Sequence, residues 1–217
     1  MYTGLRLVTP PAAEPITVDQ LRRHARIDTA EFDDLLAVYI STARTLAEQF
    51  LGRALYTQTL AWTMSQVPPS GALPLLPMPL LVLPVILSFP QIWNRPFDLP
   101  RAPVQSVSSV VVTYQDGTTA TLDPAADYSV DLGVDPARLR LGSLNLPVYA
   151  RELTVTFVAG YGAPPGTGAA SPIPAPILTG ILFLATWLWE HRGDTGDDLP
   201  LTAQALMAPY RLAVFGG

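Results

Sequence analysis

The sequence predicts an α+β fold, in which a helical bundle carries a β-rich module between its second and third helices and ends in an extended C-terminal tail. Two helical patterns lie between Thr17 and Gly52, and a third lies near residue 180. Between them the apolar pattern changes to a period of two, which is typical of strands. The predicted parts are N-terminal helices in residues 1–53, a β-rich insertion in 54–160 with a Pro-rich apolar arm at about 67–98, a loop and third helix in 161–193, and a docking tail in 194–217.

A capping box predicts the first helix. Thr17 and Gln20 stand three residues apart, so each side chain can bond the other residue's backbone N–H. Asp19 complements the helix dipole in the first turn. The helix is expected to run through about Ala25.

The second helix is predicted to start at Asp28 to Glu31 and to end at Gly52. Apolar side chains recur at steps of three and four, at Phe32, Leu35, Leu36, Tyr39, Ile40, Ala43, Leu46, Ala47 and Phe50. Polar residues occupy much of the other face, at Asp33, Asp34, Ser41, Arg44 and Glu48. We therefore expect one side of this helix to pack inward and the other to meet water or a neighbouring subunit.

Strands are predicted in the middle of the chain. The strongest signal is Asp116-Gly117, a hairpin turn flanked by strands at Val107–Tyr114 and Thr119–Leu122. Further strand-like segments are Tyr56–Met64, Tyr128–Leu132, Leu139–Leu141 and Leu153–Ala159. The last of them is expected to end in a glycine turn at Gly160-Tyr161-Gly162.

An uncharged run extends from Ala54 to Asn94, and its segment 73–93 is almost wholly apolar. Its length would suit a bilayer, which needs about 20 apolar residues. Five prolines disfavour a spanning helix, because each costs roughly 3 kcal/mol inside one. We expect an extended arm that packs against other copies of the chain or a partner. Its predicted interface residues are Leu75, Leu76, Leu80, Leu81, Leu83, Ile86, Phe89 and Trp93.

The third helix is predicted from Pro176, which presets φ in the first turn, to Gly193. Trp187 and Trp189 point in opposite directions on such a helix, so one is expected in the core and the other at a subunit interface. An acidic hinge follows, and then a short helical turn from Leu201 broken at Pro209. The residues after Pro209 alternate as a strand does, which suits addition to the edge of a partner's sheet.

The composition limits the function. The net charge is −5 and all 13 basic residues are Arg, which argues against wrapping nucleic acid. Only 14% of residues are charged and 49% are hydrophobic, so part of the surface is expected to be covered by neighbours. The absence of Cys excludes disulfides and thiolate metal sites. The N-terminal residues resemble no signal peptide, and we expect the protein to stay in the host cytoplasm until it is assembled.

Catalytic chemistry has little support in this sequence. His24 and His191 are the only histidines, and each is expected to satisfy carbonyls at a helix end. The acidic residues near Glu190 lack the spacing of a calcium loop and are expected to form a solvated hinge. We therefore predict no catalytic, cofactor or metal site, while a small hydrolase with an unrecognised site remains an alternative.

Several segments, in this order along the chain, resemble the head-tail connector (adaptor) proteins of tailed bacteriophages, a family that includes the adaptors of gene transfer agents. The resemblance covers both ends and the middle strands and leaves out roughly residues 66–98. The segments that carry it are Pro15–Asp28, Asp33–Leu36, Ala43–Glu48, Leu153–Gly162, Pro174–Ile177, Trp187–Arg192 and Leu206–Arg211.

The resemblance implies a structural protein of the virion neck, without enzymatic activity, that forms a ring beneath the portal, and it implies twelvefold symmetry for that ring. Such a ring would join the portal to a stopper or other neck protein and let DNA pass without specific binding. A stopper, a tail terminator, or a membrane-associated protein using segment 73–93 are the alternatives. The portal is expected to bind Leu201, Leu206, Met207, Pro209, Tyr210, Arg211, Leu212, Val214 and Phe215, and the candidates for the channel wall are Asp33, Asp34, Asp197 and Asp198.

Overall fold

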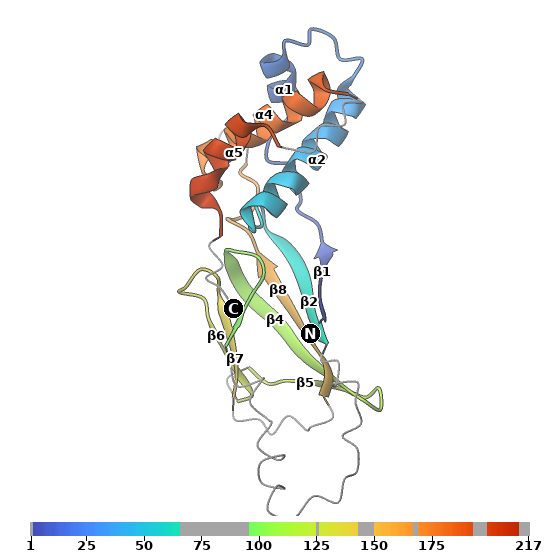
Figure 1. Cartoon of the computed structure of the whole chain (residues 1–217), viewed down its shortest axis with the longest axis vertical. Helices are drawn as coiled ribbons and strands as arrows, with labels where there is room; N and C mark the ends of the chain where they lie inside the picture. The colour runs from blue at the N-terminus through green and yellow to red at the C-terminus, as the bar shows by residue number, and fades with distance from the viewer. Residues whose placement is uncertain are drawn as a thin grey trace, which may run out of the picture. The chain divides into compact units, whose positions relative to one another are not determined.

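A computed structural model describes residues 2–65, 96–124, 126–142, 150–166, 169–192 and 199–212 (Figure 1). The chain forms two compact units, each built from several segments. The sheet unit comprises Met1–Val8, Thr59–Pro100 and Val104–Val158, and the helical unit comprises Thr9–Gln58, Arg101–Pro103 and Ala159–Gly217. Helices and β-sheets are thus both present, and the predicted α+β class is confirmed.

The helical unit consists of α1 (Val18–Ala25), α2 (Asp33–Leu51), α4 (Ala175–Glu190), α5 (Leu201–Met207) and the 3₁₀ turn η2 (Ala208–Tyr210). Helix α4 packs against each of the other three helices (Figure 1). The predicted capping box begins α1, with the Gln20 N–H donating to Thr17 Oγ1 over 3.2 Å and the Thr17 N–H donating to Gln20 Oε1 over 2.7 Å. Gly52, at φ 67°, ends α2 as expected.

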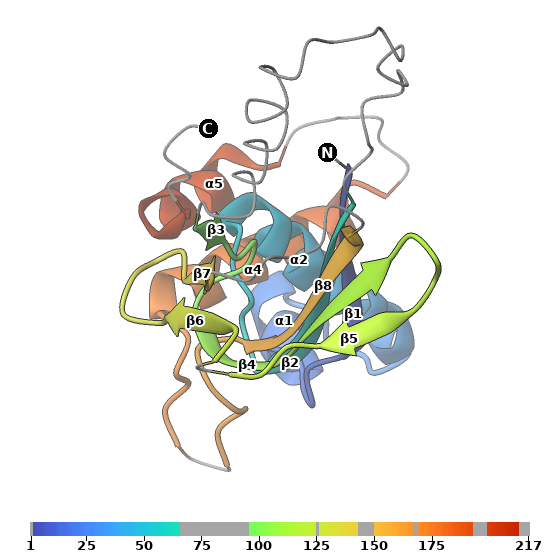
Figure 2. The same ribbon diagram turned by 90° about the horizontal axis from the view of Figure 1, so that it is seen from below.

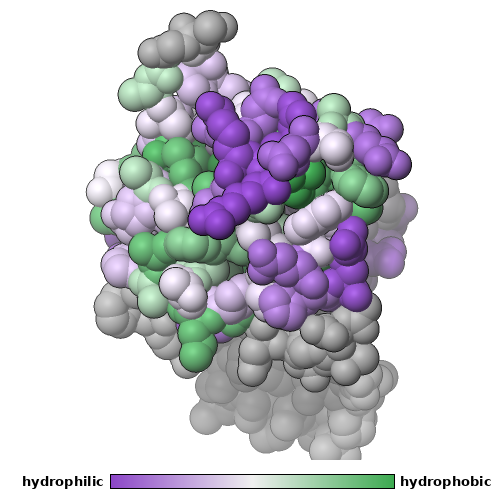
Figure 3. Space-filling view, turned by 90° about the horizontal axis from the view of Figure 1, so that it is seen from above, coloured by the Kyte–Doolittle hydropathy of each residue, from purple (hydrophilic) through white to green (hydrophobic). Residues whose placement is uncertain are grey.

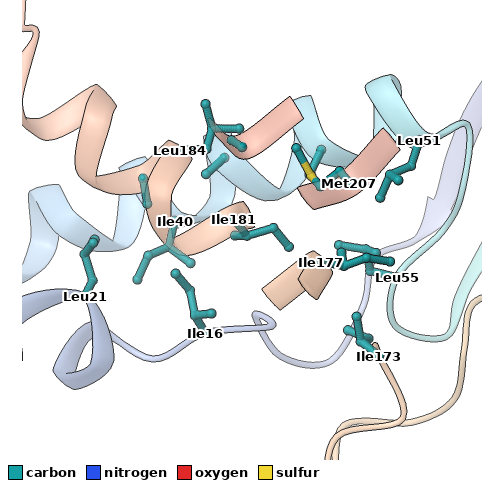
Figure 4. Packing of buried hydrophobic residues seen from close by; sticks show 14 of the residues in the cluster. Ile16, Leu21, Ile40, Leu51, Leu55, Ile173, Ile177, Ile181, Leu184 and Met207 are labelled. Carbon is teal, nitrogen blue, oxygen red and sulfur yellow. The ribbon is translucent and has the colours of Figure 1, made fainter. Parts of the chain in front are cut away.

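Side chains from α1, α2, α4 and α5 share one apolar core (Figure 4). Each fully buried Leu or Ile contributes roughly 1.5–3 kcal/mol relative to an exposed one. The largest fully buried members of this core are Leu21, Leu36, Ile40, Leu51, Leu55, Ile177 and Ile181. This core holds the surfaces of the helical unit in place.

Glu48 differs from its predicted place on the polar face of α2, because it is only 8% exposed. Glu48 Oε1 accepts the Leu55 N–H over 3.0 Å and Gln58 Nε2–H over 2.9 Å. Glu48 Oε2 lies 3.2 Å from an amino nitrogen of Arg44, whose Nε also donates to Glu14 over 2.8 Å. A carboxylate can be buried here because the fold gives each of its oxygens a partner.

Arg101 reaches the same region and donates to the backbone carbonyl of Glu48. Burial lowers the pKa of the Arg101 guanidinium, and the Glu48 carboxylate opposes that change. The two residues therefore compensate each other's loss of hydration.

The sheet unit is built on a five-stranded sheet in the order β1-β2-β8-β4-β5 (Figure 2). Its strands are β1 (Tyr2–Thr9), β2 (Gln58–Ser65), β4 (Val104–Tyr114), β5 (Thr119–Thr121) and β8 (Ala150–Ala159). A second sheet has the order β3-β7-β6, from β3 (Phe97–Asp98), β7 (Arg138–Leu141) and β6 (Tyr128–Asp131). Both pairs in the second sheet are antiparallel, with Phe97 opposite Leu139 and Tyr128 opposite Leu141.

The predicted hairpin joins β4 to β5, which are antiparallel with Val112 opposite Ala120. Gly117 adopts φ 85° in its turn, a conformation that favours glycine. Asp116 Oδ1 accepts the side-chain O–H of Thr118 over 2.7 Å and its backbone N–H over 2.9 Å, and these bonds lower the pKa of Asp116. The remaining predicted strands are also confirmed as β2, β6, β7 and β8.

Strand β1 was not predicted. Its side chains from Gly4 to Thr9 are exposed on both faces, so the alternation of buried and exposed residues that identifies a strand is absent. Backbone pairing at the edge of the sheet creates this strand. Strand β3 has only two residues, Phe97 and Asp98, which are too few to show an alternating pattern.

Candidate docking segment and interaction surfaces

Helices α4 and α5 approach closely at Gly180. A Cβ placed on Gly180 would lie 2.8 Å from Met207 Cγ and 3.4 Å from the Ala203 carbonyl oxygen. Ala203 and Met207 are fully buried on the face of α5 that meets α4. The missing side chain of Gly180 therefore allows the C-terminal segment to dock on the helical unit.

Substituting Gly180 tests this contact. We expect Gly180→Ala to be tolerated through a small shift of the flexible Met207 side chain, whereas Gly180→Leu should displace α5 from the core. Hydrogen exchange of residues 201–210 measures the effect, and it should rise strongly in Gly180→Leu alone. Gly166→Ala, where a Cβ would meet nothing within 4 Å, is the control. Protection of α5 in Gly180→Leu would contradict this account.

From the end of η2 onward, the chain is hydrogen-bonded to the C-terminal end of α2 and to Arg53, which follows it. Arg53 Nε donates to the Tyr210 carbonyl over 2.6 Å, and the Leu212 N–H donates to the Leu51 carbonyl over 2.7 Å. The Arg211 guanidinium lies 5.4 Å from the centre of the Phe50 ring. The C-terminal segment is thus part of the helical unit as far as Leu212.

The residues predicted to bind the portal do not share one environment. Met207 is part of the core, and Leu206, Tyr210 and Leu212 are half-buried. Leu201, Pro209 and Arg211 are exposed, Leu201 to 81%. Val214 and Phe215 lie outside the described residues. The 3₁₀ turn continues through Pro209 to Tyr210, so the alternating segment predicted from Tyr210 is not extended at its first residue.

Exposed apolar side chains form a surface at the start of α2. Phe32, Leu35 and Val38 stand three residues apart, and Val38 is 56% exposed. The Phe32 ring lies 5.3 Å from that of Trp189. Trp187 and Trp189 are both half-buried, and both pack against the core of the helical unit rather than dividing between core and surface. We call Phe32, Leu35 and Val38 the α2 patch.

Strand β1 carries a second set of exposed apolar side chains in the sheet unit. Leu5, Leu7 and Val8 are 38%, 45% and 44% exposed, and β1 is an edge strand. Edge strands with apolar side chains are templates for pairing with another chain. Each unit therefore presents a surface suited to a protein neighbour.

A basic pocket of about 830 Å³ lies along α1 and its C-terminal end. Figure 3 shows strongly hydrophilic residues gathered at this end of the helical unit, beside apolar ones. Its lining consists of Asp19, Arg22, Arg23, Arg26, Ile27 and Asp28. Sequence analysis missed this pocket, although three arginines within five positions were a visible signal.

Two of these arginines have partners within the helical unit. Arg22 pairs with Asp19, and its Nε lies 3.3 Å from Asp33 Oδ1, within ion-pair range but without the geometry of a hydrogen bond. Arg23 Nε donates to the Asp19 carbonyl over 3.2 Å. Among the described residues, the Arg26 guanidinium makes no hydrogen bond or ion pair.

The other predicted site residues are placed as follows. Asp33 and Asp34 lie in the first turn of α2, Asp33 half-buried and Asp34 exposed. Asp197 and Asp198 lie outside the described residues. So do all the predicted interface residues of the apolar arm, Leu75, Leu76, Leu80, Leu81, Leu83, Ile86, Phe89 and Trp93.

The two histidines are exposed at helix ends, and each contacts an aromatic ring. His24 meets the Phe183 ring edge-on at 5.3 Å, and His191 stacks on Trp187 at 5.1 Å while its Nδ1 lies 3.0 Å from the Trp187 carbonyl. Within the described parts of the chain, no group of three or more His, Asp or Glu residues is arranged to hold a metal ion. Nor does any helix in those parts have the length and apolar character needed to cross a membrane.

Residues 15–120 match the family of phage gp6-like head-tail connector proteins. No curated protein matches the chain. A chain in the solved "neck of empty GTA particle computed with C6 symmetry" is 21% identical, with a TM-score of 0.68 over 99% of this chain and 98% of its own. A chain in the "neck of native GTA particle computed with C12 symmetry" is 20% identical, with a TM-score of 0.66 over 100% and 99%.

A chain of the "virion of native gene transfer agent (GTA) particle" is 20% identical, with a TM-score of 0.68 over 98% of both chains. At 20–21% sequence identity, the structural similarity to these three chains establishes the fold. The family match confirms the resemblance drawn from the sequence, and head-tail connectors are structural proteins rather than enzymes.

Proposed function

We propose that the protein is a head-tail adaptor, because residues 15–120 match the family of phage gp6-like head-tail connector proteins. In this proposal, copies of the chain form a ring that joins the portal to the next neck protein. DNA passes through the ring. The protein acts in the neck of a virion or gene transfer agent particle and is made in the host cytoplasm.

The observation that carries this proposal is the family match, which spans α1, α2, β2, β3 and β4 and ends within β5. The likeness to chains of particle necks computed with C6 and C12 symmetry supports a cyclic arrangement. In a cyclic ring each copy contributes two different faces to its neighbours. The α2 patch and the exposed apolar side chains of β1 are surfaces of the kind that such contacts bury.

The C-terminal segment is the proposed portal contact. Its exposed members, Leu201, Pro209 and Arg211, face outward, while Met207 and the bonds of Tyr210 and Leu212 fix the segment to the helical unit. Residues 213–217 continue from this fixed point and include the apolar Val214 and Phe215.

Removing residues 213–217 is expected to abolish binding to a portal ring and leave the unfolding midpoint unchanged. A longer deletion, of residues 199–217, would also remove the buried Ala203 and Met207 and so destabilise the helical unit. Electron microscopy of mixtures with the portal ring measures collar formation, and thermal unfolding reports on stability. Deletion of Gly216 and Gly217 alone serves as the control. Collars that persist without residues 213–217 would rule out this segment as the portal contact.

The channel wall and the DNA path form a further part of the proposal. Asp34 is exposed at the start of α2, and the net charge of −5 disfavours tight binding to the phosphates of DNA. Asp33 is a weaker candidate for the wall, because Arg22 lies within ion-pair range of it. Tight binding of duplex DNA at physiological salt, measured by fluorescence anisotropy, would contradict a passive channel.

Imaging the protein with a portal ring tests the adaptor assignment as a whole. A coaxial collar at the narrow end of the portal is expected, with the protein alone and the portal alone as controls. A stopper or tail terminator would instead require another neck protein before it joined the particle. Failure of the full-length chain to bind the portal directly would therefore overturn the adaptor assignment.

A further inference from the structure

We propose that the edge strand β1 of one copy pairs with the open edge of strand β4 of a neighbouring copy, so that one sheet continues from each copy to the next. The proposal rests on the ring of the proposed function and names one contact within it. Both edges belong to the sheet unit, in which β1 and β5 are the outer strands of the order β1-β2-β8-β4-β5. A sheet edge carries unpaired backbone N–H and C=O groups, which a further strand can satisfy.

Strand β1 is an unprotected edge. It is eight residues long and pairs with β2 on one side, and no described strand pairs with its other side. Soluble proteins protect an edge with prolines, charges or bulges, or keep it very short. Strand β1 contains no proline and one charged residue, Arg6. Its exposed Leu5 and Leu7 lie on one face and its exposed Val8 on the other, so a paired strand would cover apolar surface on both faces.

Strand β4 is open beyond the end of β5. It has 11 residues, whereas β5 has three, which lie opposite Val111–Thr113. The Leu122 N–H still donates to the Val110 carbonyl over 2.8 Å, but no described strand pairs with this side of β4 before Val110. Ser106 and Ser108 in this part of the strand are exposed. The beginning of β4 therefore offers a second edge.

The hydrogen bonds of β4 show which backbone groups lie at its open edge. Alternate residues of a paired strand direct their N–H and C=O groups to the same neighbour. Val110 faces β5, while Pro103, an odd number of residues earlier, accepts the N–H of Gly160, which follows β8, over 2.9 Å. These two directions agree with an unbroken alternation along β4. The backbone N–H and C=O groups of Ser106 and Ser108 thus point away from β8, to the open edge.

The strand order assigns the contact to two different copies. Strands β2 and β8 lie between β1 and β4 in the same sheet, and β1 and β4 do not pair within the described chain (Figure 1). The two edges also differ from each other. A contact between unlike surfaces continues from copy to copy around a ring, whereas pairing of β1 with β1 would close after two copies.

The charges at the two edges are complementary. Arg6 is exposed and makes no hydrogen bond or ion pair among the described residues. Asp123 follows Leu122, the last residue beyond β5 that bonds to β4, and its exposed carboxylate has no cationic partner in the described parts of the chain. The open edge of β4 thus begins beside an acidic residue. Pairing of β1 with β1 would instead bring two Arg6 side chains into one contact, and like charges on paired strands repel.

Cross-linking in collars on the portal tests this pairing, because the chain has no Cys and introduced cysteines react without background. Leu7→Cys marks β1, and Ser108→Cys marks β4. We expect a short bismaleimide to link the double variant into a ladder of covalent oligomers. A mixture of the two single variants should give mixed dimers and nothing larger. Leu7→Cys with Gln115→Cys, which lies exposed in the turn after β4, is the control and should stay unlinked.

Each other result of the cross-linking overturns a defined statement. Links in the double variant that leave the mass of one chain unchanged would place the two edges in the same copy. Dimers from Leu7→Cys alone would show that β1 pairs with β1. Normal collars without links would remove this contact from the ring and leave the adaptor function intact. Failure of the wild-type chain to form collars would instead overturn the proposed function itself.

Proline substitutions in β4 test the backbone hydrogen bonds themselves. Ser108→Pro removes an N–H that points to the open edge, so the unfolding midpoint should stay unchanged while collars are lost. Ser108→Ala keeps this N–H and should form normal collars. Val107→Pro removes an N–H on the β8 side and should lower the unfolding midpoint. Normal collars from Ser108→Pro would contradict the pairing of β4 with β1.

Discussion

Replacing Glu48 with leucine is expected to lower the free energy of unfolding of the helical unit by about 3–5 kcal/mol. The buried N–H of Leu55 and the side-chain amide of Gln58 would both lose their acceptor. An unpaired buried polar group costs about 1–3 kcal/mol, and two such groups arise at once. Arg44 would keep Glu14 as a partner, while Arg101 would lose the negative charge that compensates its burial.

Denaturant unfolding followed by circular dichroism measures this loss. The matched control is Glu14→Gln, which removes the other carboxylate from the same Arg44. The Glu14 side chain is 34% exposed, so its ion pair is expected to contribute about 1 kcal/mol or less. Glu48→Gln should fall between the two, because its amide oxygen can still accept one of the buried donors. Similar losses of unfolding free energy in Glu48→Leu and Glu14→Gln would show that the buried carboxylate of Glu48 stabilises the fold no more than the partly exposed carboxylate of Glu14.

Local signals predicted that the helices exist because each signal is contained in a few neighbouring residues, although α2 begins at Asp33 and not at Asp28 to Glu31 as expected. The capping box at Thr17 and Gln20 and the glycine after α2 set helix ends whatever the tertiary structure is. The hairpin at Gly117 is of the same kind, since its turn depends on one residue with positive φ. These signals gave the fold class and most of the elements.

Features that depend on distant contacts could not be predicted from local patterns. Glu48 occupies a polar position in the helical repeat, and only the approach of Leu55 and Gln58 makes its burial possible. In strand β1 the side chains from Leu5 to Thr9 are all exposed, and the adjacent Leu7 and Val8 interrupt the alternation of apolar and polar residues. The sequence did not show that the C-terminal segment is fixed to the core. That attachment depends on Gly180, which lies far away in sequence and leaves the space that Met207 occupies.

The candidate site likewise has features that local sequence signals predicted and features that depend on distant contacts. The sequence indicated that the C-terminal segment was important but not which of its residues are fixed to the helical unit. The basic pocket was missed because Arg22 and Arg23 also complement the helix dipole, which is a sufficient local reason for their presence. Only the left-handed backbone of Arg26 and the cavity beside it distinguish this helix end from an ordinary one.

Gly160→Ala is expected to destabilise the helical unit by more than about 3 kcal/mol, because it combines backbone strain with a backbone clash. Gly160 adopts φ 136°, and a Cβ there would lie 2.5 Å from both the carbonyl carbon and the carbonyl oxygen of Tyr56. The Gly160 N–H donates to the Pro103 carbonyl over 2.9 Å, and the Tyr161 N–H donates to the Leu55 carbonyl over 2.8 Å. These bonds hold the backbone in place, so the clash cannot be relieved by a side chain alone.

Two further glycines separate the strain from the clash. Gly117→Ala introduces the strain alone, since Gly117 has φ 85° and a Cβ there would meet nothing within 4 Å, and it should cost about 1–2 kcal/mol. Gly4→Ala introduces neither and should be close to neutral. Denaturant unfolding of the three variants should give losses in the order Gly160, Gly117, Gly4. A loss in Gly160→Ala no larger than that in Gly117→Ala would show that the segments around Tyr56 and Gly160 can move apart, and that the close backbone contact is not required for the helical unit to fold.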